Sequence, residues 1–365
     1  MPSYTVLLGC GLRLARTTSF LRQLILLSKF FEKRQVRTAI FGPDGIYPVT
    51  HPPDTEHRSS ENYIFLEELV KSRGARAAIL LGYPDQFPFL HHAPETLHLY
   101  LWAQFSRPPE KGALSGVRSV PLTQKTKTFI LFSGEKRVTR VIPHGVDTRV
   151  YRPLDGKTVS FARKTMGLED RFVIGSVGAH TPRKRLDLII KTFAEIRRVH
   201  REATLIIKTD RIRSLEGTDL QAHAQREGVF DETIFITEDL SAGRMCALYN
   251  VMDIYLNLSE WEGFCIPVIE AMSCGIPVSS LPVQGPGETV PYEELRIPPR
   301  GIVDETGSML LECEPEAAAE IIVDVSRNRS LVRELSRTGR REATSKFDIR
   351  RVAALWEELI GGHAN

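Results

Sequence analysis

The sequence contains few cysteines, and their placement argues against a structural zinc site. The five cysteines (Cys10, Cys246, Cys265, Cys274 and Cys313) are scattered, odd in number and never arranged as Cys-x-x-Cys. Structural zinc sites use closely spaced pairs of this kind, and stable disulfides form in oxidising compartments. We therefore expect no zinc site and a reducing, cytoplasmic location.

Long hydrophobic runs are also missing. No apolar stretch is long enough to cross a bilayer as a helix, and no basic leader precedes the strand-like segment 4–8. We therefore expect neither a membrane span nor a signal peptide. Hydrophobic residues make up 42% of the 365 and charged residues 25%, which is typical of globular proteins with full cores. A chain of this length accommodates two ordinary domains.

The charge is unevenly distributed although the net charge is only +3. Residues 1–150 contain 20 lysines and arginines against 12 acidic residues, whereas the remainder contains 28 against 33. This asymmetry indicates different ligands or surfaces for the two halves. The basic segment 19–34 could make peripheral contact with an anionic membrane, but a core helix with a solvated basic face is the commoner arrangement.

Strand and helix patterns alternate along both halves. Short apolar segments that predict strands in the first half lie at 5–8, 36–41, 77–81, 97–102 and 117–122. Those of the second half lie at 172–177, 204–208, 233–236, 253–258 and 278–281. Helical patterns lie between them at 19–33, 60–73, 124–132, 186–200, 220–227 and 242–251. This alternation predicts an α/β protein with two doubly wound, Rossmann-like parallel sheets that face a central ligand cleft.

A segment rich in structure-breaking residues separates the halves. Pro143, Gly145 and Pro153 interrupt regular structure around it. We therefore expect three parts: an N-terminal domain, a C-terminal domain and a final amphipathic helix, at 1–145, 146–345 and 346–365. His144 lies in the separating segment, where it could reach the cleft or be an ordinary polar linker residue.

The segment 259–277 carries the strongest functional signal. It reads Ser-Glu-Trp-Glu-Gly-Phe-Cys-Ile-Pro-Val-Ile-Glu-Ala-Met-Ser-Cys-Gly-Ile-Pro, directly after the predicted strand 253–258. Gly263 suits a tight turn, and Pro267 suits the first position of a helix. The segment therefore predicts a strand, a turn and the start of a helix.

Such a helix start would bind an anion. The amides of Gly263, Phe264, Cys265 and Ile266 would converge there, at the positive end of the helix dipole. Glu262 lies on the loop before the helix and Glu270 about one turn inside it. An anion site flanked by two carboxylates suits a sugar nucleotide, with diphosphate on the amides and hydroxyls on the glutamates. The alternative is a helix start whose acidic residues serve only the dipole and solubility.

Taken in order, Glu-Gly-Phe, Pro267, Glu-Ala-Met and Gly-Ile-Pro-Val resemble the Glu-x7-Glu signature of retaining GT-B glycosyltransferases of family 4. The resemblance implies a GT-B architecture and transfer of a sugar from a nucleoside diphosphate sugar with retained anomeric configuration. It further implies that Glu262 contacts hydroxyls of the donor sugar and that Glu270 binds the ribose. The amides of 264–266 would hold sugar and phosphate oxygens.

A basic loop, Val-Gly-Ala-His-Thr-Pro-Arg-Lys-Arg-Leu-Asp, occupies positions 177–187 after the first strand of the second half. Members of the resembled family carry an arginine after the glycine and a lysine before the next helix, and both hold the donor diphosphate. Lys184 takes the lysine position, whereas Ala179 stands at the arginine position and Arg183 could supply the second cation. A solvated basic turn is the alternative.

The first half carries weaker signals. Gly-Cys-Gly11 follows the first strand, and the resemblance places a glycine loop there, with Gly11 beside the donor diphosphate. Many relatives also have a histidine after a first-lobe strand, near the donor sugar. The segment 103–106 contains none, and His98 and the His91-His92 pair are the substitutes that the sequence offers.

No Asp-x-Asp pair occurs in the sequence, so the metal-dependent GT-A design has no ligand set. We therefore predict a metal-independent transferase without a cofactor. Arg183, Lys184 and the helix dipole would neutralise the leaving diphosphate, and Glu262 would complete the catalytic set.

The acceptor is not indicated beyond a possible glycan or lipid. Nucleic acid is not expected as a partner, because no reader motif accompanies the basic residues. The alternative function is a catalytically degenerate GT-B module that binds a sugar nucleotide or glycan without turnover. Ala179 and the missing first-lobe histidine favour that alternative.

Overall fold

The computed structural model describes residues 5–10, 19–42, 45–47, 70–91, 94–105, 107–303 and 309–362. The chain divides into two compact units. The first contains Met1–Asp147 and Phe347–Asn365, and the second contains Thr148–Lys346. Gly11 and most of the predicted helix 60–73 lie outside the described residues.

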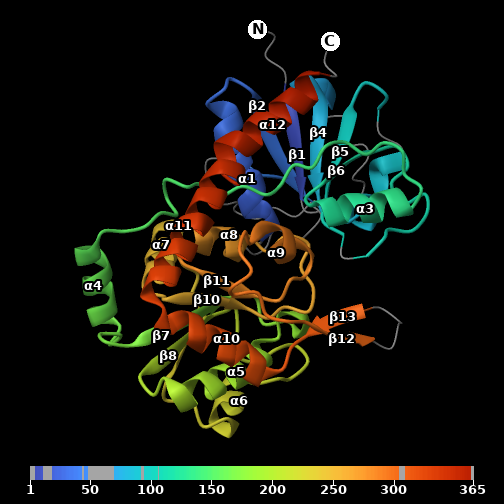
Figure 1. Ribbon diagram of the computed structural model, residues 1–365. Helices are drawn as coiled ribbons and strands as arrows, with labels where there is room; N and C mark the ends of the chain where they lie inside the picture. The colour runs from blue at the N-terminus through green and yellow to red at the C-terminus, as the bar shows by residue number, and fades with distance from the viewer. Residues whose placement is uncertain are drawn as a thin grey trace. The chain divides into compact units, whose positions relative to one another are not determined.

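The described strands of the first unit form one sheet in the order β3-β2-β1-β4-β5-β6 (Figure 1). They are β1 (Thr5–Cys10), β2 (Arg37–Gly42), β3 (Gly45–Tyr47), β4 (Ala75–Leu81), β5 (His98–Ala103) and β6 (Arg118–Pro121). All pairs are parallel except β2 with β3. The helices are α1 (Ser19–Glu32), α3 (Gln124–Phe132) and α12 (Ile349–Gly361), with short 3-10 turns at Pro84–Gln86 and Pro88–His91.

Helix α1 is a core helix of this unit. Leu24, Leu27 and Phe31 are fully buried, and the helix contacts β1, β2 and α12. The Gln23 side chain exchanges two hydrogen bonds with the backbone of Gly145, at 2.9 and 3.1 Å. Protein therefore covers the apolar face of α1, as the core-helix alternative predicts.

Helix α12 belongs to the first unit, beside α1 (Figure 1). A parallel bridge between Val146 and Asp348 ties the chain before the second unit to the chain after it. The Val146 amide donates to Phe347 O at 2.8 Å, and the Ile349 amide donates to Val146 O at 3.0 Å. Helix α12 thus packs within the unit that the first half of the chain forms.

His144 is a core residue of the first unit. It is 1% exposed, and its ring lies 4.6 Å from that of Trp102, which also packs edge-on against Trp356. Burial lowers the pKa of His144 to about 3. The imidazole is therefore neutral throughout the physiological range.

This buried imidazole predicts a loss of stability in acid. The unfolded chain binds a proton at His144 below its ordinary pKa, whereas the folded chain does so only near pH 3. Acidification from about pH 6.5 to pH 5 should therefore lower the free energy of unfolding by roughly 2 kcal/mol through this residue alone. In urea unfolding, the free energy of unfolding should fall less between the two pH values for His144→Phe than for the parent. Equal losses in the two proteins would contradict the prediction.

The second unit is built on an all-parallel sheet in the order β11-β10-β7-β8-β9 (Figure 1). Its strands are β7 (Phe172–Val177), β8 (Ala203–Lys208), β9 (Thr233–Ile236), β10 (Ile254–Asn257) and β11 (Val278–Ser280). Its helices are α4 (Gly156–Thr165), α5 (Leu186–Val199), α6 (Leu220–Arg226), α7 (Ala242–Asn250), α8 (Ile266–Ser273), α9 (Gln284–Thr289), α10 (Pro315–Arg327) and α11 (Arg329–Lys346). A separate antiparallel hairpin joins β12 (Arg300–Val303) and β13 (Met309–Glu312).

The strand order of this sheet locates a ligand site. From β7 the chain proceeds to β8 and β9 on one side, and it then returns to β10 and β11 on the other. The carboxyl ends of β7 and β10 are therefore adjacent, at the point where the direction of winding changes. Open parallel sheets bind ligands at such switch points.

Candidate active site

Two loops meet at this switch point, one after β7 and one after β10. The first ends in a 3-10 turn, Pro182–Lys184, before α5 begins, and the second leads into α8. A backbone hydrogen bond from the Glu260 amide to Arg183 O, at 2.9 Å, joins the two loops. The structure thus brings together the two segments that the sequence marks separately.

Glu262 is the centre of the polar contacts between these loops. It is 5% exposed, and its Oε1 accepts from the Lys184 ammonium and lies 2.9 Å from Arg183 Nη1. Burial alone would raise the pKa of Glu262, but Lys184 and Arg183 outweigh it and hold the pKa below its usual value. Glu262 is therefore a buried, ionised carboxylate between two cations.

Asn257 and Ser259 extend this arrangement. The Ser259 hydroxyl lies 3.0 Å from Glu262 Oε1 and 2.9 Å from Asn257 Oδ1, but it has only one proton to donate. Because Glu262 is ionised, it is the stronger acceptor for that proton. Asn257 Oδ1 also accepts from the Cys265 thiol, whose sulfur lies 3.7 Å away.

Polar contacts thus run from Cys265 through Asn257 and Ser259 to Glu262. All four side chains are buried. Ser259 thus gives Glu262 Oε1 a third contact beside those from Lys184 and Arg183.

Arg183 is the more accessible of the two cations. Its side chain is 32% exposed, whereas that of Lys184 is 9% exposed. The guanidinium lies over the Trp261 ring, 4.8 Å from its centroid. Stacking on an aromatic face leaves the edge of the guanidinium available for paired hydrogen bonds to phosphate oxygens.

Arg185 fixes the backbone that presents these cations. Its φ is +45°, in the left-handed region that residues with a Cβ rarely adopt. Its guanidinium contacts Asp187 at 3.2 Å, Glu260 at 2.9 Å and Glu312 at 2.6 Å. These ion pairs connect the first loop to the second loop and to β13, and they offset the strain of roughly 1–2 kcal/mol at this residue.

A second left-handed residue, Cys265, directly precedes helix α8, and its φ is +69°. No side chain caps the helix start, and Pro267 lies in its first turn. Burial raises the pKa of the Cys265 thiol to about 12, so it stays protonated. A Cβ at Gly285 would lie 2.4 Å from Phe264 backbone atoms, so this glycine allows the loop to pass closely. The backbone of the helix start is thus held from both sides.

Glu270 lies one turn into α8 and is half-buried. Its Oε2 accepts a hydrogen bond from the Tyr249 hydroxyl at 2.8 Å. Burial, together with the Glu270 charge, raises the pKa of Tyr249 well above its usual value. Tyr249 therefore remains a hydrogen-bond donor that orients Glu270.

A family model described as "Glycosyl transferases group 1" matches residues 160–342, which is half of the chain and includes both loops. The chain belongs to this family.

Curated relatives of this chain match over part of their length. A D-inositol 3-phosphate glycosyltransferase from Acidothermus cellulolyticus is 29% identical, over 45% of this chain and 37% of the relative. The lipopolysaccharide core biosynthesis mannosyltransferase LpsB from Rhizobium meliloti is 25% identical, over 60% of this chain and 61% of the relative. The chain thus spans less than two thirds of either relative.

Solved glycosyltransferase structures resemble almost the whole chain. A glycosyltransferase from Rickettsia africae has a TM-score of 0.78 at 14% identity, covering 99% of this chain and 98% of that one. Anabaena HepE, solved with UDP and glucose, has a TM-score of 0.72 at 15% identity, covering 98% and 100%. The predicted fold class, GT-B with two Rossmann-like domains, is confirmed, whereas the cleft between them stays a prediction.

The predicted site residues fall into three groups. Arg183 and Lys184 both contact Glu262. Gly263, Phe264, Cys265 and Ile266 form the turn and the start of α8, and Glu270 follows one turn later. Gly11 lies outside the described residues.

Three side chains of the site were not predicted. Asn257 and Ser259 come at the carboxyl end of a buried parallel strand, a position that could have identified them. Tyr249 is 21 residues from Glu270, on another helix, and nothing in the sequence marks it.

Proposed function

We propose that the protein transfers a sugar from a nucleoside diphosphate sugar to a hydroxyl acceptor, with retained anomeric configuration and without a metal ion. The observation that carries the proposal is the convergence of Lys184 and Arg183 on Glu262, at the start of α8. Two cations and a helix N-terminus suit a diphosphate, and the carboxylate between them suits sugar hydroxyls. The family to which the chain belongs supports this chemistry.

Donor binding would change the partners of the two cations. Phosphate oxygens would take up hydrogen bonds from Arg183 and Lys184, which in the structure go to Glu262. Glu262 would in turn accept hydrogen bonds from the donor sugar, while Ser259 keeps it oriented. The cations and the α8 dipole would then stabilise the negative charge that grows on the leaving nucleoside diphosphate.

The remaining roles follow from what each group can donate or accept. Glu270, held by Tyr249, would accept hydrogen bonds from the ribose hydroxyls. Retention is consistent with a departing phosphate that takes the proton of the acceptor hydroxyl on the same face. We propose a glycan or a lipid as the acceptor. Relatives named for inositol phosphate and for lipopolysaccharide core support that choice.

Binding of a nucleotide in EDTA tests the donor site. We expect one set among UDP-, GDP- and ADP-sugars to raise the melting temperature by about 5–10 °C at a hundredfold excess over Kd. Glu270→Ala should abolish most of the shift. Lys191→Ala, an exposed lysine on α5, is the matched control and should keep it.

The same experiment separates the alternatives. No shift with any nucleotide would overturn the donor site. A shift that needs a divalent cation would contradict metal independence. Binding without sugar transfer or donor hydrolysis would favour the degenerate, non-catalytic module.

A further inference from the structure

Two of the five cysteines form a buried pair at the end of α8. Cys246 lies on α7, and Cys274 directly follows Ser273, the last residue of α8. The two sulfur atoms are 3.9 Å apart, and the residues are 3% and 2% exposed. The proposed donor site uses neither thiol. Thiols in contact need only small movements of their side chains or helices to reach the S–S length of a disulfide, about 2 Å.

The surroundings of the pair make its two thiols unequal. The Cys274 thiol donates to the Cys246 sulfur, and the Asn250 side-chain amide donates to the same sulfur at 3.5 Å. The hydrogen bond from Cys274 lowers the pKa of Cys246, although burial acts in the opposite direction. The same hydrogen bond, together with burial, raises the pKa of Cys274. Cys246 is therefore the thiol that loses its proton more readily, and it is the better nucleophile.

The segment of chain that contacts the pair is itself exposed. The Cys246 thiol donates to Arg152 O at 3.5 Å. A Cβ on Gly275, the residue after Cys274, would lie 3.3 Å from Pro153. Both Arg152 and Pro153 are exposed. Local opening of so short a segment gives a small oxidant access to the sulfur atoms without unfolding α7 or α8.

We propose that Cys246 and Cys274 form a reversible disulfide in response to a hydroperoxide, and that this bond weakens donor binding. The Cys246 thiolate attacks one oxygen of hydrogen peroxide, the O–O bond breaks, and a sulfenic acid forms as hydroxide leaves. Cys274 then loses its proton and attacks this sulfur, so that the S–S bond forms while the S–O bond breaks and hydroxide leaves. Protonation of both hydroxides gives water. The two thiols lose two electrons, which reduce one peroxide to two waters, and a dithiol reverses the oxidation by exchange.

The disulfide would act on the donor site through the hydrogen bond from Tyr249 to Glu270. Tyr249 lies three residues after Cys246 on α7, and Glu270 lies four residues before Cys274. The two contacts are therefore neighbours, one helical turn apart, between the same pair of helices. Shortening the sulfur contact from 3.9 Å to about 2 Å disturbs the neighbouring 2.8 Å hydrogen bond. This consequence rests on the proposed function, in which Glu270 binds the ribose.

Peptide mapping tests the bond itself, without any donor. We expect the folded full chain, treated with hydrogen peroxide and then alkylated, to give a linked peptide with Cys246 and Cys274 that dithiothreitol removes. Cys246→Ser and Cys274→Ser should give none. Cys313→Ser is the matched control and should give it in full, because Cys313 is also 3% exposed but lies between β13 and α10. No linked peptide, or one that forms only after unfolding in urea, would overturn the proposal.

Donor binding tests the consequence. Among UDP-, GDP- and ADP-sugars, the set that binds the reduced protein should bind about tenfold more weakly after oxidation, since a hydrogen bond to a charged group is disturbed. Dithiothreitol should restore the affinity, and peroxide-treated Cys246→Ser should keep it. A linked peptide with unchanged affinity would overturn the coupling to Glu270.

Failure of the proposed function gives a different result. If the reduced protein binds none of these nucleotides, the donor site is contradicted, whereas the linked peptide is unaffected. The effect of the bond is then measured by hydrogen exchange. Exchange of the α7 and α8 amides should slow on oxidation of the parent, because the bond opposes separation of the two helices, but not on peroxide treatment of Cys246→Ser. Unchanged exchange in the oxidised parent would overturn an effect of the bond on these helices.

Discussion

A Lys184→Met variant is expected to lose most sugar transfer and to lower the free energy of unfolding of the second unit by about 3 kcal/mol. Lys184 is 8% exposed, and its ammonium contacts the buried Glu262 carboxylate. The variant leaves that carboxylate buried with Arg183 as its remaining cation. Removing one member of a buried pair costs more than the pair contributes, because the other charge stays out of water. With the proposed diphosphate contact also lost, turnover should fall roughly 100- to 1000-fold.

The double variant Lys184→Met/Glu262→Gln separates stability from catalysis. Without the buried negative charge, it should recover much of the lost stability while sugar transfer stays low. Urea unfolding and initial rates measure the two effects on the same samples. Recovery of transfer together with stability would assign both Lys184 and Glu262 a structural role only.

The pH dependence gives a further check on this pair. The pKa of Glu262 is lowered in the folded chain because its two cations outweigh its burial, so its ionised form stabilises the fold above the ordinary carboxyl pKa. That stability disappears as the pH falls through the lowered pKa. The difference between the parent and Lys184→Met should therefore be large near pH 7 and shrink as the pH falls, first as the carboxyl of the variant is protonated and finally as the pH passes the lowered pKa of the parent. A difference that does not depend on pH would contradict the ion pair.

The elements around the site could be predicted because each has a local signal. The apolar run 253–258 and the Gly263 turn indicate a strand followed by a helix, and the structure confirms them as β10 and α8. Buried parallel strands are short continuous apolar runs, which distinguish them from their surroundings without tertiary information. The same property identified β4 and β7.

Contacts between distant segments could not be predicted in this way. Lys184 and Glu262 are 78 residues apart, and they meet only because β10 pairs with β7. The sequences of the individual strands do not predict this strand order. The surface of α1 gives a second example, since α12, at the far end of the chain, packs against it. A basic amphipathic segment alone does not distinguish a covered helix from an exposed one.

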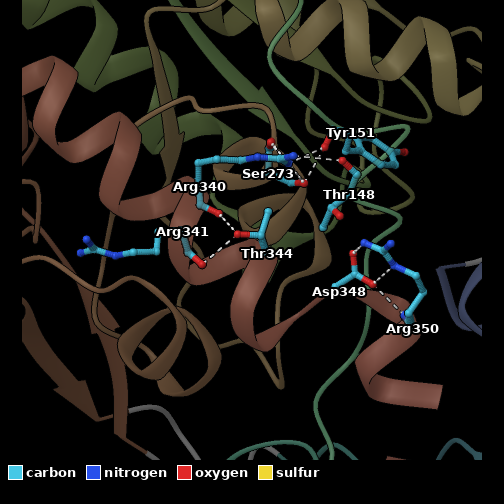
Figure 2. A network of polar contacts seen from close by, with 8 residues as sticks. All are labelled: Thr148, Tyr151, Ser273, Arg340, Arg341, Thr344, Asp348 and Arg350. Atoms are coloured by element: carbon cyan, nitrogen blue, oxygen red, sulfur yellow. Dashed lines mark hydrogen bonds and ion pairs between the residues drawn. The ribbon is translucent and has the colours of Figure 1, made fainter. Parts of the chain in front are cut away.

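Arg340→Met is expected to destabilise the second unit by about 2–4 kcal/mol. Figure 2 shows the Arg340 guanidinium at the centre of a polar cluster. It donates to Tyr151 O and Ser273 Oγ at 2.9 Å, to Thr148 O at 3.1 Å and to Ser273 O. The Ser273 hydroxyl in turn donates to Tyr151 O at 2.6 Å. Methionine fills similar space but leaves three part-buried carbonyls without their charged donor.

This cluster matters for function because Ser273 is the last residue of α8, the helix that begins at Ile266 and carries Glu270. The final carbonyls of a helix lack partners within it, and a cation there complements the dipole. Arg340 therefore fixes the end of α8 opposite to the proposed phosphate site. In the Met variant, hydrogen exchange of α8 amides should accelerate, and donor affinity should fall less than stability does.

Arg341→Met is the matched control, because Arg341 is the next residue on α11 and Figure 2 shows its guanidinium pointing away from the cluster. It should leave both α8 exchange and the unfolding transition close to those of the parent. Arg340→Lys should rescue little, since a single ammonium cannot reproduce the planar fork that reaches Thr148, Tyr151 and Ser273 together. Full rescue by lysine would mean that charge at the helix end is sufficient. Equal effects of the two methionine variants would mean that the stability depends on the overall charge of α11 and not on this cluster.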